Sequence, residues 1–382
     1  MADLSVKLGD LELKNPVMVA AGPWTRDPAS IQRYVDAGAG AVITESITMD
    51  ANQASRPYLY RNGEQIFNTK LHSTLYLEQW EELAAGMDMR DCKLICSIWG
   101  STVTEVRYLS NYVQRLGADA VELSLYAPIG SRNQSMCTSA EHIADVIRET
   151  MDAVDIPVMV KLPYEVSFFP EVLQAIYDAG VKTVSSIDAL RGISGVDIET
   201  ATPNMPTYGG YSGTPIRPVA LATTAMLRQY TPFYICGCGG IQNAENAIEQ
   251  MMLGASAFQF ASALFSRGER LIRDTVNDLQ NWLDQHGYRS VEEIIGLALP
   301  RMTAFEAIPI RPIYAVTEKE CDRKDCDLCR QGCIYQAIEY VKGKGYRILE
   351  DRCEGCGHCM SVCPENKIRL GGIPPVSYRK RN

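Results

Sequence analysis

The sequence predicts an α/β protein, a (β/α)8 barrel of the TIM type with a small cysteine-rich domain after it. The first observation is that eight short apolar runs alternate with eight amphipathic segments over roughly 270 residues, as in such a barrel. The second is that eight of the 13 cysteines lie beyond residue 320. An open doubly wound sheet has the same local alternation, so the pattern favours the barrel without excluding that sheet.

The expected elements follow one another along the chain. A hairpin around Gly9-Asp10 covers 4–14, where apolar and polar residues alternate. The expected strands are the apolar runs 16–22, 41–46, 93–100, 120–126, 157–163, 183–188, 233–240 and 257–264. The expected helices are the amphipathic segments 28–38, 75–86, 102–116, 139–153, 169–179, 216–230, 242–253 and 267–286, with one more over 287–299.

Two connections are too long to be plain turns, and both follow strands at the carboxyl-terminal mouth of the barrel. They are residues 47–74 and 189–215. Barrel enzymes build their active sites from such loops. The expected organisation is therefore a barrel over 1–299, a proline-punctuated linker over 300–319, a cysteine-rich domain over 320–372 and a tail over 373–382.

The cysteines form two runs with the spacing of ferredoxins. Cys353, Cys356, Cys359 and Cys363 make a C-x2-C-x2-C-x3-C-P run, the bacterial signature for [4Fe–4S] clusters, whose fourth cysteine binds the other cluster. The upstream run is Cys321, Cys326, Cys329 and Cys333, with a wider first gap and Ile334 in place of proline. Exchanging the fourth ligands gives one cluster on Cys321, Cys326, Cys329 and Cys363, and a second on Cys353, Cys356, Cys359 and Cys333. The alternative is that the cysteines bind zinc, but zinc sites favour separated C-x2-C pairs.

Composition narrows the class of protein. The net charge of −9 argues against a nucleic-acid or anionic-membrane partner. The five remaining cysteines have no disulfide-framework spacing, so we expect a reducing, cytoplasmic location. The N-terminus lacks the pattern of a signal peptide, and no apolar run approaches the ~20 residues of a membrane span.

The last two barrel strands end in small residues. Strand seven runs into Cys236-Gly-Cys-Gly-Gly-Ile241, and strand eight into Phe260-Ala-Ser-Ala-Leu-Phe265. Many barrels bind a phosphate here through backbone N–H groups, although a tight turn without a ligand has the same sequence. A flavin phosphate is the better interpretation, because flavin couples the one-electron chemistry of clusters to hydride transfer.

Several motifs resemble the dihydroorotate and dihydropyrimidine dehydrogenase superfamily. The stretch 208–221 (YGGYSGTPIRPVAL) is similar to the G-G-x-S-G-x-x-I-R-P-x-A-L motif of dihydropyrimidine dehydrogenase. Residues 8–16 and 20–23 resemble the entry to the dihydroorotate dehydrogenase barrel, and 160–163 (VKLP) also matches. Nearly the whole chain resembles the C-terminal half of dihydropyrimidine dehydrogenase, an FMN barrel joined to two clusters.

The resemblance implies a set of FMN-binding residues. Ala21 and Gly22 would lie under the flavin ring, Lys161 near its pyrimidine edge, and Ser124 at a flavin-contacting position. The remaining residues, around the ribityl chain and phosphate, would be Gly213, Gly239, Gly240, Ala261 and Ser262. The alternative for Lys161 is an ordinary strand-end lysine.

Other positions depart from the family pattern. Where family members have E-L-N-x-S-C-P, this chain has Glu122-Leu-Ser-Leu-Tyr-Ala-Pro128, so Ala127 replaces the acid/base cysteine and Ser124 an asparagine. Glu45 stands for a lysine and Asp188 for an asparagine that holds the pyrimidine ring. A carboxylate facing the imide carbonyls of a pyrimidine would add an unpaired buried charge. We therefore expect a substrate other than dihydroorotate or uracil.

Three side chains are candidates for the missing proton donor: Tyr126, His72 and Cys137. The alternatives are a packing role for Tyr126, a core or surface histidine at 72 and a buried small hydrophobe at 137. Asn68 matches a substrate-binding asparagine of the family. Glu45 either faces a basic group of the substrate or forms an ion pair, and Asp188 is the third candidate for substrate binding.

The predicted function is that of an iron–sulfur flavoprotein oxidoreductase acting on CH–CH groups of a small cyclic or carbonyl-conjugated metabolite. Electrons pass through two [4Fe–4S] clusters to FMN. The alternatives are an electron-transfer subunit of a larger complex and a divergent dihydropyrimidine dehydrogenase subunit. No G-x-G-x-x-G follows a strand here, so the expected donor is a ferredoxin or a separate NAD(P)H-oxidising flavoprotein. We also expect a homo-oligomer, a dimer.

Overall fold

A computed structural model describes residues 1–126, 139–308, 313–317, 321 and 326–371. The chain divides into two units, Met1–Met302 and Thr303–Asn382. The predicted tail over 373–382 lies outside the described residues. Within the described part, no helix combines the length and apolar character needed to cross a membrane.

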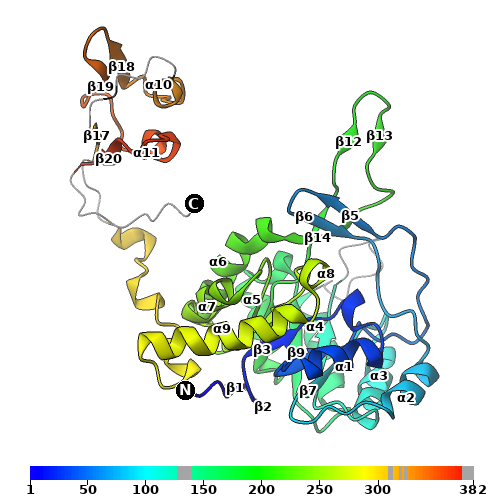
Figure 1. Ribbon diagram of the computed structural model, residues 1–382. Helices are drawn as coiled ribbons and strands as arrows, with labels where there is room; N and C mark the ends of the chain where they lie inside the picture. Colours follow the sequence, from blue (N-terminus) through cyan, green and yellow to red (C-terminus); the bar gives the residue numbers. More distant parts are fainter. Residues whose placement is uncertain (127–138, 309–312, 318–320, 322–325, 372–382) are drawn as a thin grey trace. The chain divides into compact units, whose positions relative to one another are not determined.

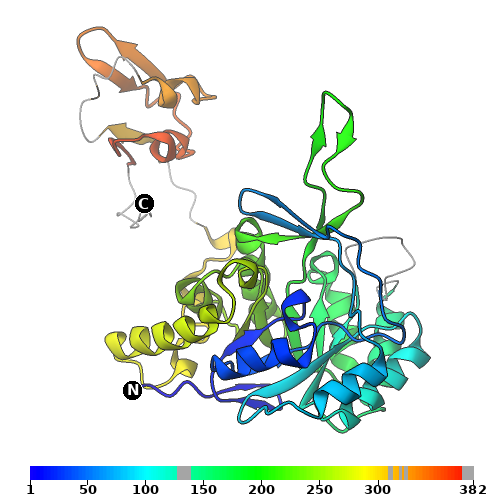
Figure 2. The same cartoon turned by 45° about the vertical axis from the view of Figure 1, so that its right-hand side comes forward.

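The first unit is a closed parallel barrel, as the sequence predicts (Figures 1 and 2). Its strands are β3 (Val17–Val19), β4 (Ala41–Ile43), β7 (Lys93–Ile98), β8 (Ala120–Ser124), β9 (Val158–Leu162), β10 (Thr183–Ser186), β15 (Tyr234–Cys238) and β16 (Ala257–Phe260). Sequential strands pair in parallel around the ring, and β16 closes on β3, where Phe258 pairs with Val17. The open-sheet alternative is therefore excluded.

Helices cover the outside of the barrel (Figure 1). They are α1 (Pro28–Asp36), α2 (Leu77–Ala84), α3 (Val103–Arg115), α4 (Ala140–Met151), α5 (Pro170–Asp178), α6 (Arg217–Tyr230), α7 (Ala244–Met252) and α9 (Arg270–His286), with the short α8 (Leu264–Arg267) after β16. Four of them begin at a capping residue: Asp27, Thr102, Ser139 and Asn243 each accept a backbone N–H of the first turn. The apolar helix faces pack on the strands, and this places the core between the two layers.

The N-terminal hairpin, β1 (Val6–Leu8) and β2 (Leu11–Leu13), lies against the amino-terminal end of the barrel. Its inward residues are buried and its outward ones exposed. Gly9, with a φ of +64°, approaches the Thr183 side chain at the start of β10. The hairpin therefore closes the end of the barrel opposite the mouth.

The predicted helix over 287–299 is wrong. Gly287 ends α9 in the left-handed conformation, and the segment forms a 3-10 turn over Val291–Ile294 and begins a second one, Leu299–Arg301. The backbone bonds instead to the N-terminal segment, because Asp3 N donates to Arg289 O and Val291 N to Asp3 O, both at 2.8 Å. Packing of Val291 and Ile294 into the core fixes this arrangement.

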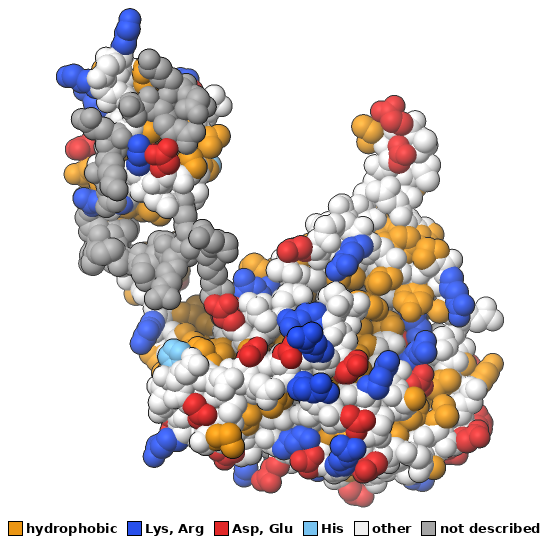
Figure 3. All heavy atoms as spheres, in the orientation of Figure 1, with side chains coloured by type: hydrophobic (Ala, Val, Ile, Leu, Met, Phe, Trp, Pro, Cys, Tyr) orange, Lys and Arg blue, Asp and Glu red, His pale blue; other side chains and the backbone are white. Residues whose placement is uncertain are grey.

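The two long connections form a sheet of their own at the barrel mouth. Its strands, in order, are β11 (Leu190–Gly192), β14 (Gly209–Gly213), β6 (Gln65–Asn68) and β5 (Leu59–Asn62). Phe67 and Tyr211 stack across it with ring centroids 5.0 Å apart. A hairpin of β12 (Val196–Asp197) and β13 (Thr202–Pro203) projects beyond this sheet (Figure 1). Figure 3 shows acidic and hydrophobic side chains at its tip, and basic and acidic ones interspersed over the helices below.

The second unit is built around the cysteines. It pairs β17 (Ala315–Thr317) with β20 (Ile368–Leu370) and β18 (Ile338–Val341) with β19 (Gly345–Ile348). Two short helices, α10 (Leu328–Gln331) and α11 (His358–Val362), carry Cys329 and Cys359 at equivalent second positions. A Cβ on Gly332 would lie 2.3 Å from His358 Nε2, so the ends of the two helices approach closely.

Candidate active site

A cavity opens at the carboxyl-terminal end of the barrel, and all eight strands or the residues just after them contribute to its wall. Of the predicted site residues, the cavity is lined by Ala21, Gly22, Glu45, Asn68, His72, Ser124, Tyr126, Lys161, Asp188, Gly239, Gly240, Ala261 and Ser262. Gly213 is not among the lining residues; its φ of +98° and its approach to Glu64 O belong to the turn after β14. Ala127 and Cys137 lie outside the described residues.

The last two strands present unsatisfied backbone donors to this cavity. Among the described residues, the N–H groups of Gly239, Gly240, Ala261 and Ser262 donate to no protein acceptor. Gly240 has a φ of +71°, and a Cβ there would lie 2.7 Å from Arg217 N, so the backbone packs too tightly for a side chain. Buried N–H groups rarely stay unpaired, and converging donors of this kind fit a phosphate.

Lys161 lies inside the barrel on β9 and is 7% exposed. Its Nζ donates to Gln259 Oε1 at 2.6 Å, and Gln259 Nε2 donates to Glu122 Oε2 at 2.9 Å. Burial acts to lower the pKa of Lys161, but the nearby Cys238 thiol and Glu122 and Asp188 carboxyl groups raise it above its ordinary value. The cavity wall therefore contains a permanent ammonium group, which suits the electron-rich edge of a reduced flavin.

The residues present thus fit FMN. Four free N–H groups match its phosphate, small residues at Ala21 and Gly22 leave room beside β3, and Lys161 supplies a positive charge at the opposite wall. A Cβ on Gly22 would lie 2.5 Å from the Trp24 ring, so this position requires glycine for packing as well.

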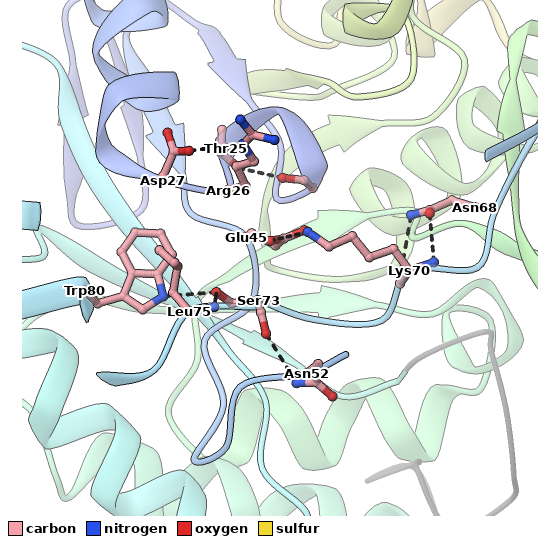
Figure 4. A network of polar contacts seen from close by, with 11 residues as sticks. Thr25, Arg26, Asp27, Glu45, Asn52, Asn68, Lys70, Ser73, Leu75 and Trp80 are labelled. Carbon is pink, nitrogen blue, oxygen red and sulfur yellow. Dashed lines mark hydrogen bonds and ion pairs between the residues drawn. The ribbon is translucent and has the colours of Figure 1, made fainter. Parts of the chain in front are cut away.

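Glu45 and Lys70 form an ion pair in the cavity wall, shown in Figure 4. Lys70 Nζ lies 2.5 and 2.8 Å from the two oxygens of Glu45, and both side chains are almost fully buried. Of the two alternatives for Glu45, the ion pair is therefore the one that forms. The expectation of an unpaired charge is wrong for Glu45, because both oxygens already accept from Lys70.

The loop that carries Lys70 is fixed to the barrel. Asn68 Oδ1 accepts the Lys70 N–H at 2.9 Å, and Ser73 N donates to Ser46 O at 2.9 Å. Trp80 Nε1 donates to Ser73 Oγ at 3.1 Å (Figure 4). Asn68 thus positions Lys70 as well as lining the cavity. The sequence interpretation missed Lys70, whose signal is a lysine two residues after Asn68 in a long mouth loop.

Gln259 and Glu122 were also missed as site residues. Gln259 stands in an otherwise apolar run of β16, and a polar residue inside a buried strand is a sign of a polar partner across the barrel. Its partners are Lys161, Glu122 and Ser185 Oγ, the last at 3.0 Å.

The candidate proton donors differ in environment. Burial lowers the pKa of His72 to about 4, and its ring stacks on Trp99 with centroids 4.7 Å apart. His72 is therefore neutral at pH 7 and holds no imidazolium proton to donate. Burial raises the pKa of the Tyr126 phenol, which keeps its proton at neutral pH. The Arg191 guanidinium lies 5.3 Å from the Tyr126 ring centroid.

The second unit contains two small cavities, each lined by four cysteines. Cys321, Cys326, Cys329 and Cys363 line one, and Cys333, Cys353, Cys356 and Cys359 line the other. Backbone N–H groups of Ala315, Ala337 and Lys367 donate to Cys353, Cys333 and Cys363 sulfurs at 3.3–3.4 Å. Sulfurs that surround a space and accept N–H bonds fit iron–sulfur clusters. Among the described residues, no three His, Cys, Asp or Glu side chains lie close enough together to hold a single metal ion directly.

Comparison with known proteins agrees with this architecture. A family described as dihydroorotate dehydrogenase matches residues 3–283, and one described as a 4Fe-4S binding domain matches residues 346–366. The catalytic subunit of dihydroorotate dehydrogenase B (NAD(+)) from Pyrococcus abyssi is 32% identical over 307 residues, which cover 78% of this chain and 99% of that protein. The same subunit from Thermococcus kodakarensis is 32% identical over 302 residues, with the same coverage.

A solved structure shares the fold. Dihydroorotate dehydrogenase from Eimeria tenella, in complex with ferulenol, aligns with a TM-score of 0.64 over 77% of this chain and 88% of that one. The sequence identity is 20%, so this likeness concerns the fold alone.

Proposed function

Because the chain belongs to the dihydroorotate dehydrogenase family and has a 4Fe–4S binding segment, we propose that it is an FMN oxidoreductase with two [4Fe–4S] clusters. It acts on a carbon–carbon bond of a small cyclic or carbonyl-conjugated metabolite that is neither dihydroorotate nor uracil. The observation that carries the proposal is that two four-cysteine cavities and a flavin-type barrel mouth occur in one chain.

The proposed cofactor sites use this chain's own residues. Gly239, Gly240, Ala261 and Ser262 would hold the FMN phosphate through their N–H groups, and Lys161 would face the pyrimidine edge of the ring; all five line the cavity. When bound, FMN supplies hydride exchange with carbon and accepts single electrons from iron–sulfur clusters. The cysteines of the two cavities would bind the two clusters, with the fourth ligands exchanged between the runs.

In the proposed site, Tyr126 holds the proton for the reacting carbon, because its phenol stays protonated at neutral pH and lines the cavity. Glu45 holds Lys70, and Asn68 holds the turn that carries it. His72, neutral and stacked on Trp99, shapes the wall.

We further propose that electrons come from a separate partner, a ferredoxin or an NAD(P)H-oxidising flavoprotein. The related dihydroorotate dehydrogenase B proteins are named catalytic subunits, which supports an additional electron-transfer component. The alternative is that this chain only transfers electrons and a partner binds the substrate. The cavity wall of Tyr126, Asn68, Lys70 and Asp188 favours substrate binding in this chain.

We expect no turnover of dihydroorotate, uracil or thymine. Without the family's cysteine, rates fall by about 10²–10⁴, as is typical for loss of a positioned acid. Asp188 adds a carboxylate where a pyrimidine presents carbonyl oxygens. The assay reduces the protein anaerobically with a reduced ferredoxin, adds uracil, thymine or orotate, and follows the return of oxidised flavin absorbance.

The same assay with a metabolite panel tests the proposed function. A compound that reoxidises the isolated chain supports a catalytic role. Reoxidation that requires a second protein would favour the electron-transfer alternative, and efficient turnover of uracil, thymine or orotate would contradict the proposed specificity.

A further inference from the structure

The charged side chains in the cavity wall are five among the described residues: two ammonium groups and three carboxyl groups. They are Glu45, Lys70, Glu122, Lys161 and Asp188. Burial makes an unpaired charge costly, so each of them needs a partner. The hydrogen-bond partners of each charged side chain show which of the five is free to bind a ligand.

Four of the five are paired within the protein. Glu45 binds Lys70 directly, with both carboxylate oxygens engaged (Figure 4). Glu122 Oε2 accepts from Ser185 Oγ at 2.7 Å and from Gln259 Nε2 at 2.9 Å, and Gln259 Oε1 accepts from Lys161. Lys161 and Glu122 are thus joined through one amide.

Asp188 is the remaining charge. Its N–H donates to Leu162 O at 3.0 Å, and its Oδ1 accepts from Ala189 N at 2.7 Å, so the side chain is held in place. No lysine, arginine or histidine of the described residues lies within ion-pair distance of it. Lys161 acts on it only at longer range, because the Lys161 Nζ donates to Gln259, and the wall has three carboxyl groups for two ammonium groups. Arg191, three residues along, lies over the Tyr126 ring instead.

A carboxylate has about four acceptor positions, and one local N–H fills only one of them. Burial raises the pKa of Asp188 and the Lys161 ammonium group opposes that rise, so the Asp188 charge is only partly offset within the wall. A ligand that brings a positive charge and N–H donors removes that cost, and an amidinium or ammonium group does both. An anionic ligand would add a second negative charge beside it.

We propose that Asp188 is a specificity-determining residue that selects a substrate with a positively charged nitrogen group, an ammonium or amidinium. This rests on the proposed function, because it places the substrate in the flavin cavity. The group pairs with the free positions of the Asp188 carboxylate, while the charges of Glu45 and Glu122 stay satisfied within the wall.

Three probes of similar shape and different charge test the proposal: benzamidinium, benzamide and benzoate. Each is titrated into the FMN-containing, cluster-containing protein, and binding is followed through the flavin absorbance. We expect benzamidinium to bind and benzoate not to. In Asp188→Asn, benzamidinium binding weakens about 30-fold or more, as for loss of a buried charged partner, and the preference over benzamide disappears.

Asp278→Asn is the matched control, since it makes the same change at an exposed residue of α9 that does not line the cavity. It should keep the benzamidinium affinity of the native protein. If native protein with full FMN content binds benzoate as tightly as benzamidinium, or binds none of the probes, the proposal fails while the proposed function stands. Unchanged benzamidinium affinity in Asp188→Asn also overturns it. Native protein that holds no FMN contradicts the proposed function itself, and this inference with it.

Discussion

Replacing Cys329 and Cys363 together should leave one intact [4Fe–4S] cluster, whereas replacing Cys329 and Cys333 together should leave none. Cys329 and Cys363 line the same cavity although 34 positions separate them along the chain, and Cys333, four positions from Cys329, lines the other. The first double variant therefore damages one site, and the second damages both. Electron paramagnetic resonance of the anaerobically reduced proteins counts the intact clusters, and iron analysis of the first should give about four irons.

If each cysteine run instead bound its own cluster, the two results would be exchanged. Cys96→Ala serves as control because Cys96 is buried in β7 of the barrel and lines neither of the two cavities, so its variant should keep the native iron content. FMN content should stay at the native level in all three variants, since the flavin residues belong to the barrel.

Lys161→Met should lower FMN affinity about 10- to 100-fold, the usual consequence of losing a hydrogen bond to a charged group. The substitution also leaves Gln259 Oε1 without its donor and removes the only ammonium group linked to Glu122 among the described contacts. The reduced flavin should lose more stabilisation than the oxidised one, so the flavin potential falls. Fluorescence of released FMN and a spectroelectrochemical titration measure the two effects.

The matched control is Lys182→Met, which removes a lysine beside β10 whose side chain is 60% exposed and pairs with Asp10 near the opposite end of the barrel. It should keep native FMN affinity. The cluster absorbance should be unchanged in both variants. Native affinity and potential in Lys161→Met would mean that Lys161 does not contact the flavin.

The barrel could be predicted because each strand is a local apolar run. All eight expected runs contain the observed strands, since strands buried on both faces are largely apolar and need no distant information to identify them. The helices were predicted for the same reason, from their apolar stripe. The segment 287–299 was not, because its backbone partners are at Asp3, nearly 290 residues away in sequence.

The sheet at the mouth depends on contacts that local patterns do not contain. Asn68 of β6 pairs with Gly210 of β14, and neither segment reveals its partner. The candidate site shows the same division. Lys161 can be predicted as a site residue because it lies at a strand end within a motif. Lys70 cannot, because only the folded loop brings it to Glu45. Asp188 departs from the family pattern in the sequence itself, but its lack of a direct ion-pair partner follows only from the positions of Lys70, Lys161 and Arg191.

The central claim is that one chain binds one FMN and two [4Fe–4S] clusters, and cofactor analysis of anaerobically purified protein tests it most directly. The expected content is about eight irons and about eight acid-labile sulfides per chain, from two four-cysteine sites, with about one FMN from the barrel mouth. The measurement combines metal analysis, sulfide determination and the absorbance of flavin released on denaturation. Stoichiometric zinc with little iron would contradict the cluster assignment, and iron without flavin would contradict the barrel site.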